Sequence, residues 1–217
     1  SLIAIVGFWD DQDHIRARWR LLLHFIAAIW VLYWFGGLPE FEFIGLAFNL
    51  DWFGFVVVAF ALVWLLNLFN FMDGIDGIAA SETIFIALAG AYFSWLNGLN
   101  DLSFISLVLA SSTFGCLILN WAPAKIFMGD VGSGFLGLIL GIIAYIGILQ
   151  GILVWTWLIL FAVFLADSGV TLLRRVISGD NFYEAHCSHA YQNAARKWGH
   201  KKVTLAVIGI NIFVLFP

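Results

Sequence analysis

Charged side chains are scarce in this 217-residue sequence, where Lys, Arg, Asp and Glu together make up only 11% of the chain. A nucleic-acid-binding protein needs a basic balance, but the formal net charge here is −4. A soluble core of this size could not hide 22 Phe and 11 Trp behind ten basic and fourteen acidic side chains. The composition therefore excludes both a nucleic-acid-binding protein and a soluble globular domain.

Cysteine is equally rare. Cys116 lies in an apolar run and Cys187 in a polar one, so the chain offers at most one bridge and no disulfide framework. We expect both side chains to be free thiols. A cleavable signal peptide is not visible either, because residues 1–9 have no basic region before them and no small-residue cleavage site after them.

The sequence is instead rich in long apolar runs, with 63% hydrophobic residues and a mean hydropathy of +0.98. A segment in lipid must satisfy its own backbone hydrogen bonds, and these runs lack the alternation of barrel strands, so we expect helices. Each run is long enough to cross a bilayer with some tilt. The six predicted full spans are residues 21–38, 52–70, 78–96, 102–121, 133–150 and 151–169.

Two shorter apolar segments lie at the ends of the chain. Residues 2–9 supply about half of the twenty or so residues that a spanning helix requires, and residues 203–217 reach about 22 Å against roughly 30 Å of hydrocarbon. The chain also begins with Ser1 rather than Met. We therefore expect a chain truncated at both ends. The predicted fold is all-α: a single domain, 1–217, forming a polytopic transmembrane helical bundle with six full and two partial spans.

The basic residues give the orientation of this bundle. When the spans are followed alternately in and out, all ten Lys and Arg fall on one side, while the opposite loops, 39–51 and 97–101, hold acids and no base. By the positive-inside rule the basic side is cytoplasmic. The predicted cytoplasmic loops are about 10–20, 70–77, 122–132 and 170–202.

Eight aspartates fall on the same face although they are far apart in the chain, so they can converge on one site. They are Asp10, Asp11, Asp13, Asp73, Asp76, Asp130, Asp167 and Asp180. Three of them, Asp10, Asp11 and Asp13, lie within four residues and repel one another unless a cation compensates them. This group suits a Mg²⁺ site or a proton acceptor, although a solvated helix end is an equally good interpretation.

A second polar group ends the second full span. Asn70, Asp73 and Asp76 follow one another at intervals of three, and two Asp-Gly pairs let the backbone turn and approach a ligand closely. A tight polar turn between antiparallel spans explains one such pair but not the second, nor two amides so near the membrane. We favour a binding site here.

A third group leads into the fifth span and contains Lys125, Gly129, Asp130, Gly132 and Gly134. Glycines at a helix start leave backbone N–H groups open to an anionic phosphate, while the aspartate could hold a hard cation against that phosphate. Close helix packing would explain glycines within the span, but not Asp130.

The fourth group, His186 and His189, lies in the long polar stretch after the sixth span. Their i, i+3 spacing lets both rings donate hydrogen bonds to phosphate or sugar from one helical face. With Cys187 they could also form half of a zinc site, but two further ligands at matching spacing are absent from the sequence.

Together these groups resemble the polyprenyl-phosphate N-acetylhexosamine-1-phosphate transferases, glycosyltransferase family 4, over nearly the whole chain. The residues that carry the resemblance are Asp10-Asp11 followed by Arg16, Arg18, Arg20 and His24; the 67–77 block; the 127–134 block; and His186-x-x-His189 with Tyr191-Gln192. The 167–175 segment and the residues around His189 look more like the bacterial branch that initiates O-antigen than like the branch that makes the first peptidoglycan lipid. Cys187 departs from the pattern, since relatives usually carry Arg there, which puts the donor-phosphate contact or the sugar preference in doubt.

The resemblance implies transfer of a sugar 1-phosphate from a UDP-sugar to undecaprenyl phosphate, with release of UMP, at the cytoplasmic face of a bacterial inner membrane. It implies Mg²⁺, or Mn²⁺, as cofactor and a homodimer as a plausible assembly. It implies that Asp10 or Asp11 deprotonates the lipid phosphate or, in a two-step alternative, attacks the donor. The other roles it implies are Asp130 with Asp76 as metal ligands, and Asn70, Asp73, Asp76, Lys125, His186 and His189 as substrate contacts.

Several alternatives remain open at this point. The same motifs fit a phospho-MurNAc-pentapeptide transferase, and the sequence does not choose among N-acetyl sugars or between one-step and two-step chemistry. A secondary transporter is the alternative of another class, since ionisable residues at membrane depth often mark ion pathways. Only His24, Glu82 and Asp167 lie inside the predicted spans, all toward their cytoplasmic ends, which disfavours an ion relay.

Overall fold

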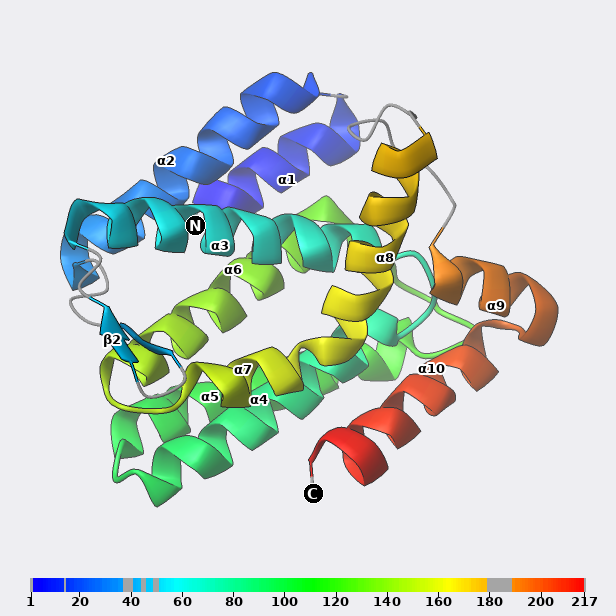
Figure 1. Ribbon diagram of the computed structural model, residues 1–217. Coiled ribbons are helices and arrows are strands. Elements are labelled where there is room, and N and C mark those ends of the chain that lie inside the picture. Colours follow the sequence, from blue (N-terminus) through cyan, green and yellow to red (C-terminus); the bar gives the residue numbers. More distant parts are fainter. Residues whose placement is uncertain are drawn as a thin grey trace.

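The computed structural model describes most of the chain as one helical bundle (Figure 1). The described residues are 2–13, 15–36, 41–43, 46–48, 51–178 and 189–216. The helices are α1 Leu2–Gln12, α2 Ala17–Phe35, α3 Asp51–Met72, α4 Ile78–Leu96, α5 Asn100–Asn120, α6 Gly129–Leu149, α7 Val154–Leu160, α8 Ala162–Ser178, α9 Ala190–Trp198 and α10 His200–Ile210, which continues into a π-helical turn, Asn211–Leu215. The predicted class, a polytopic helical bundle, is confirmed.

A short antiparallel hairpin interrupts the predicted loop 39–51. Its strands are β1 Phe41–Phe43 and β2 Leu46–Phe48, paired so that Phe41 faces Phe48 and Phe43 faces Leu46. This hairpin was not predicted from the sequence. It lies at the end of the bundle where the α6–α7 connection also lies (Figure 1).

The number of membrane-crossing helices differs from the predicted six. Within the described residues, four helices are long and apolar enough to cross, namely α3, α4, α5 and α6, and the pair α7 and α8 makes a fifth if it is counted as one span. The predicted first span, 21–38, corresponds to α2, which starts earlier and so carries Arg18 and Arg20 in its first turns. These two arginines lower the mean hydropathy of this helix.

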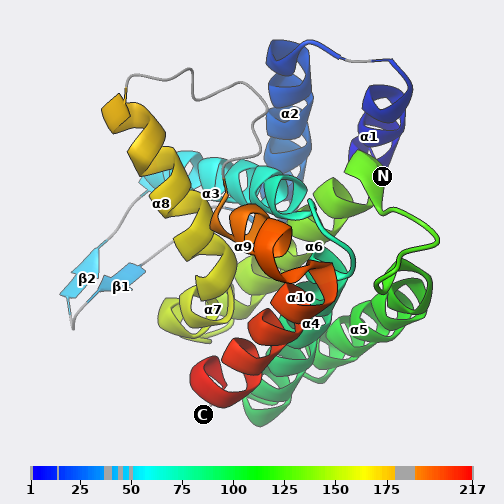
Figure 2. The ribbon, with the colours of Figure 1, turned by 90° about the vertical axis from the view of Figure 1, so that its right-hand side faces the viewer.

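The predicted sixth span, 151–169, is not one straight helix. It is broken between α7 and α8, whose axes meet at 75°. Buried aromatic side chains fill the corner: the ring of Phe69 lies 6.2 Å from that of Phe161 and 5.0 Å from that of Phe164. As a result α8 rises along the side of the bundle away from α5 (Figure 2).

Small residues bring the central helices together. A Cβ added to Gly137 of α6 would lie 2.6 Å from the carbonyl oxygen of Leu65, so α3 and α6 are in backbone contact. Between α4 and α5, Ser103 donates a hydrogen bond of 2.9 Å to the carbonyl oxygen of Ala91. A hydrogen bond also connects the π-helical turn after α10 to α4, because the side-chain amide of Asn211 donates to the fully buried carboxyl group of Glu82 at 2.6 Å.

Candidate active site

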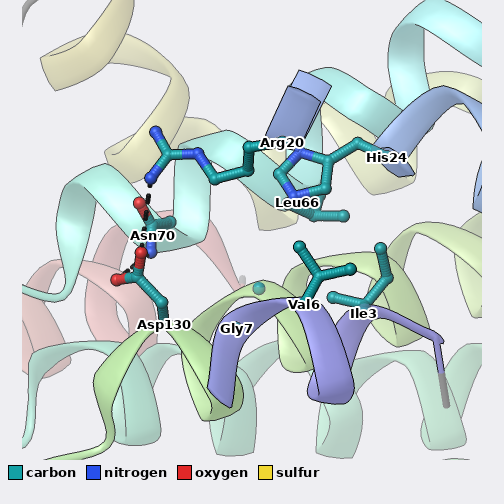
Figure 3. Close-up of a pocket in the computed structure, with 9 residues that line it drawn as sticks. Ile3, Val6, Gly7, Arg20, His24, Leu66, Asn70 and Asp130 are labelled. Atoms are coloured by element: carbon teal, nitrogen blue, oxygen red, sulfur yellow. Dashed lines mark hydrogen bonds and ion pairs between the residues drawn. The ribbon is translucent and has the colours of Figure 1, made fainter. Parts of the chain in front are cut away.

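Asp130 is the residue on which distant parts of the chain meet. It is the second residue of α6, and its Oδ1 accepts a 2.7 Å hydrogen bond from the side-chain amide of Asn70 at the end of α3. Its Oδ2 lies 3.4 Å from Nη1 of Arg20 in α2. Figure 3 shows these three side chains converging from three helices. The structure therefore brings the second and third predicted groups together at one end of the bundle, with Arg20, which follows the first group in the sequence.

Asp10 enters the same site from α1. Its Oδ2 lies 2.7 Å from the same Arg20 nitrogen that faces Asp130, and its Oδ1 accepts the backbone N–H of Ile15 at 2.8 Å. The side chain is only 7% exposed. Burial alone would raise the pKa of Asp10, but the guanidinium of Arg20 and the Ile15 N–H together hold that pKa below its usual value. Asp10 is therefore an ionised carboxylate next to Asp130.

Asp11 occupies the helix start that the sequence analysis assigned to a phosphate. Its Oδ1 accepts the backbone N–H of Asp130 at 3.1 Å. A Cβ on Gly129, whose φ is +64°, would lie 2.7 Å from the other carboxylate oxygen, so glycine is needed for this approach. The anion that faces this N–H is thus a side chain of the protein, and a phosphate could reach it only by displacing Asp11.

Asp73 follows α3 and lies within the electrostatic reach of Asp130. Burial and the negative charge of Asp130 raise the pKa of Asp73 to about 7. The neighbouring Gly74 leaves room for Tyr191 of α9, whose hydroxyl donates a 2.9 Å hydrogen bond to the carbonyl oxygen of Phe71. Burial also raises the pKa of Tyr191, which stays a neutral hydrogen-bond donor. Helix α9 is thereby fixed against the polar turn.

Asp76, which the resemblance implies as a metal ligand together with Asp130, makes three contacts with other segments. Its Oδ2 accepts the backbone N–H of Ala124 at 3.2 Å, its Oδ1 lies 3.2 Å from Nδ1 of His200, and its carbonyl oxygen accepts the hydroxyl of Thr204 at 2.9 Å. These contacts hold α10 and the 122–124 loop against the start of α4. In the part of the chain that the structure describes, no hydrogen bond or ion pair joins Asp76 to Asp130.

Three predicted substrate contacts remain, namely Lys125, His189 and His186. Lys125 is exposed on the loop that leads into α6, and its backbone N–H donates to Leu119 at 2.8 Å. His189 stands directly before α9, where its Nδ1 lies 2.9 Å from Oδ1 of Asp167. His186 and its neighbour Cys187 lie outside the described residues.

Sequence reasoning missed two residues at this site. Asn120 is buried at the end of α5, where its side chain accepts the N–H of Gly77 at 3.0 Å and donates to the carbonyl of Ile126 at 2.9 Å. An amide at the end of an apolar run was the available signal. The other is Arg20, which the sequence analysis treated only as one of a basic series.

A small cavity of about 10 Å³ lies beside Asp130 and is lined by Gly7, Arg20, His24 and Asn70 among others (Figure 3). Nδ1 of His24 is buried without a hydrogen-bond partner among the described residues. Space of this size holds about one water molecule. The cavity is therefore a gap beneath the acids and too small for a substrate.

The described residues contain no group of three His, Cys, Asp or Glu side chains arranged to hold a metal ion.

The bundle and its clustered acids define the class of protein: a polytopic membrane protein with a cluster of carboxylates at one end of its helices. The sequence model of Glycosyl transferase family 4 matches residues 1–148 of the 217. The chain belongs to glycosyl transferase family 4, as the resemblance predicted.

Individual relatives agree with this assignment. The chain is 28% identical over 195 residues to a Bacillus subtilis protein named as an undecaprenyl-phosphate N-acetylglucosaminyl 1-phosphate transferase, covering 88% of this chain and 54% of that protein. It is 33% identical over 155 residues to the phospho-N-acetylmuramoyl-pentapeptide-transferase of Moorella thermoacetica, covering 65% and 49%. It is 31% identical over 161 residues to a Sulfolobus acidocaldarius protein named as a UDP-N-acetylglucosamine–dolichyl-phosphate N-acetylglucosaminephosphotransferase, covering 72% and 49%. The chain thus spans about half the length of the curated relatives it matches.

Proposed function

We propose that this chain forms the catalytic part of an enzyme that transfers an N-acetylhexosamine 1-phosphate from a UDP-sugar to undecaprenyl phosphate. The observation that carries the proposal is the contact of Asp130 with Arg20 and Asn70, because it gathers three distant segments at the end of the apolar helices. Family membership and the printed names of the relatives support the same reaction. They give no comparable support to the alternative of a secondary transporter.

In a one-step transfer, an oxygen of undecaprenyl phosphate attacks the sugar-bearing phosphorus of the donor. The bond from that phosphorus to the UMP oxygen breaks, and UMP leaves. Asp10 or Asp11 takes the proton of the acceptor phosphate; in the two-step alternative the same carboxylate attacks the donor first. The lowered pKa of Asp10 keeps it in the ionised form that both roles require, and it also makes Asp10 a weaker base than an unperturbed carboxylate.

The proposed cofactor is Mg²⁺, with Mn²⁺ as the other hard cation considered. Asp130 and Asp73 fit such an ion, because both offer hard oxygen ligands. Burial is the first cause of the raised pKa of Asp73 and the negative charge of Asp130 is the second, and a bound cation would offset both. A bound cation at these two carboxylates would neutralise charge that builds up on the donor diphosphate during transfer. We add Asp73 to Asp76 as a candidate for the second ligand, since the Asp76 carboxylate also accepts the N–H of Ala124 and lies beside His200.

The donor contacts are proposed to be the cations and amides around the acids. His189 and Lys125 would face the diphosphate, together with His186, and Arg20 would hold Asp10 and Asp130 in place. Arg20 can also offer its remaining N–H groups to a phosphate, since a guanidinium has five donors in a fixed plane.

We further propose that the enzyme works in the bacterial cytoplasmic membrane, with this site on the cytoplasmic face, and starts an envelope glycan such as the O-antigen of lipopolysaccharide. The one-sided distribution of Lys and Arg supports the orientation. The membrane supplies the lipid acceptor, and a second copy of the chain is the candidate protein partner, on resemblance alone.

A second donor is worth testing because the Moorella relative, at 33% identity, is named as a phospho-N-acetylmuramoyl-pentapeptide-transferase. UDP-MurNAc-pentapeptide therefore belongs in the same assay as UDP-GlcNAc and its deoxy analogues. The sugar that appears on the lipid product decides between the two branches.

The test uses the intact protein in detergent, undecaprenyl phosphate, a panel of UDP-sugars and a readout of UMP release. Asp130→Asn should lower Mg²⁺-dependent transfer by about 100-fold or more, because it removes a charged ligand and keeps the size of the side chain. The matched control is Asp101→Asn, since Asp101 is also an acid in the first turn of a crossing helix but is exposed at the other end of the bundle. Equal activity of the two variants would contradict the role of Asp130, and failure of every UDP-sugar would contradict the reaction.

A further inference from the structure

Asp167 of α8 contacts the start of α9 through both of its carboxylate oxygens. Its Oδ1 lies 2.9 Å from Nδ1 of His189 and accepts the backbone N–H of Ala190 at 3.2 Å. Its Oδ2 accepts the backbone N–H of Tyr191 at 2.8 Å. The hydroxyl of Thr171, one turn later in α8, adds a 3.4 Å contact to Oδ1. One carboxylate thus holds the start of α9 and the ring that precedes it.

These contacts determine how the His189 ring is presented. We assign the proton to Nδ1, because this nitrogen lies 2.9 Å from Asp167 and an ionised carboxylate can only accept hydrogen bonds. The ring nitrogen that can meet a substrate is then Nε2. The backbone contacts to Ala190 and Tyr191 fix the position of the residue itself, so that both the placement and the rotation of the ring depend on the same side chain.

The contact between Asp167 and His189 is largely shielded from solvent. His189 is 13% exposed and Asp167 is 11% exposed, so solvent does not compete freely for the contact. The next residues of α9 reach the polar turn after α3, where Tyr191 donates to the carbonyl of Phe71. His189 is therefore tied on one side to the bent helix α8 and, through Tyr191, to the segment that carries Asn70 and Asp73.

We propose that Asp167 is a positioning residue for donor binding, which orients His189 so that Nε2 faces the diphosphate of the UDP-sugar. The inference rests on the proposed function, because it takes His189 as the donor contact. Asp167 itself does not touch the substrate; it acts through the ring, as the buried carboxylate partner of a histidine commonly does.

The experiment compares Asp167→Asn, His189→Ala and the double variant of the intact protein, with UDP-N-acetylglucosamine as donor and undecaprenyl phosphate as acceptor. The ring contacts Oδ1 and the Tyr191 N–H contacts Oδ2, so an asparagine, which has NH₂ in one of these two places, cannot accept from both without moving. Asp167→Asn should raise the KM for the donor by about 10- to 100-fold, the usual effect of losing a charged hydrogen-bond partner. The KM for the acceptor should stay unchanged.

The double variant separates positioning from a merely structural role. If Asp167 acts through His189, Asp167→Asn should add nothing to the donor KM once the ring is absent. A loss of the helix cap alone would lower thermal stability and activity equally in both backgrounds. Thr171→Val is the matched control, because it removes a contact to the same carboxylate and leaves the contact between Asp167 and His189; its donor KM should equal that of the wild type.

Each outcome bears on one of the two proposals. A normal donor KM in His189→Ala would contradict the donor contact and with it part of the proposed function. A raised donor KM in His189→Ala with a normal value in Asp167→Asn, or effects that multiply in the double variant, would overturn only the role of Asp167. If Asp167→Asn does not fold, Asp167→Glu keeps the charge and shifts the carboxylate by one methylene; it should raise the donor KM in the presence of His189 and not in its absence.

Discussion

Replacing Gly7 by alanine tests whether the close contact of α1 with α6 sets the geometry of the acids. Gly7 lies one turn before Asp10 and Asp11, and a Cβ at this position would lie 2.6 Å from the backbone nitrogen of Val131 and 2.7 Å from the carbonyl of Asp130. Ordinary contact begins at 3.4 Å, so the helices must separate by about 0.8 Å. The obstacle is backbone on both sides, and no side chain can turn away to make room.

A shift of this size is enough to break the site. The hydrogen bond from the Asp130 N–H to Asp11 is already 3.1 Å long, and Nη1 of Arg20 lies 3.4 Å from Asp130. A displacement of about 1 Å at a reacting group costs on the order of 100-fold in rate. Overpacking of this kind also lowers the free energy of unfolding by about 1–3 kcal/mol. Gly7→Ala should therefore insert into the membrane but lose most transfer activity.

The matched control is Gly134→Ala in the same helix contact. A Cβ on Gly134 would lie 3.5 Å from a methyl carbon of Ile3 and 3.6 Å from one of Leu66, which is ordinary van der Waals contact. Alanine also favours the helix over glycine. UMP release and thermal unfolding of both variants in detergent give the comparison. Full activity of Gly7→Ala would refute the argument, as would equal losses in the two variants.

Two further predictions concern charge and topology. The pKa of Asp73 is raised from 3.8 to about 7 in the folded protein, so the folded state holds this proton more tightly than the unfolded state does. In buffer without divalent cations, the free energy of unfolding should therefore fall as pH rises from about 4 to 7. Asp73→Asn should flatten this fall when thermal unfolding is compared at pH 4.5 and 7.5, and an unchanged slope would contradict the raised pKa. In a background without the native cysteines, Gly98→Cys should react with an impermeant thiol reagent added outside the cytoplasmic membrane and Lys125→Cys should not; labelling of the latter from outside would reverse the proposed orientation.

The parts of the fold that depend on apolar length and on charge were predictable. The span 78–96 coincides with α4, Ile78–Leu96, because the polar turn before it and the Asn97-Gly98 pair after it mark its ends in the sequence. The meeting of Asp10, Asn70 and Asp130 was predictable for a related reason, since the basic residues assign their segments to one end of the bundle. Arg20 contacts Asp10 and Asp130, and Asn70 joins them through its hydrogen bond to Asp130.

The contacts that could not be predicted from the sequence depend on hydrogen-bond and packing partners that only the folded structure brings together. Asp11 and Asp76 are acids of the same chemical kind as Asp130, yet one faces the start of α6 and the other holds Ala124 and His200. The 75° corner at Phe161 has no proline or glycine to announce it. Asp167 lies 22 residues before His189, and no periodicity links them. Sequence patterns place residues on a face of the membrane, but they do not assign hydrogen-bond partners on that face.

The pairing of the first helices with α6 has a consequence for how the protein is made. Asp11 and Arg20 find Asp130 across 119 and 110 residues of chain. A ribosome that adds 5–20 residues per second needs about 5 to 25 seconds to produce that intervening length. During this interval α1 and α2 are already synthesised, and their acids and arginine can pair with one another but not with α6. The carboxylate cluster is therefore completed after four more helices have been synthesised, and any factor that delays the insertion of α6 prolongs the period in which the nascent chain carries a half-formed site.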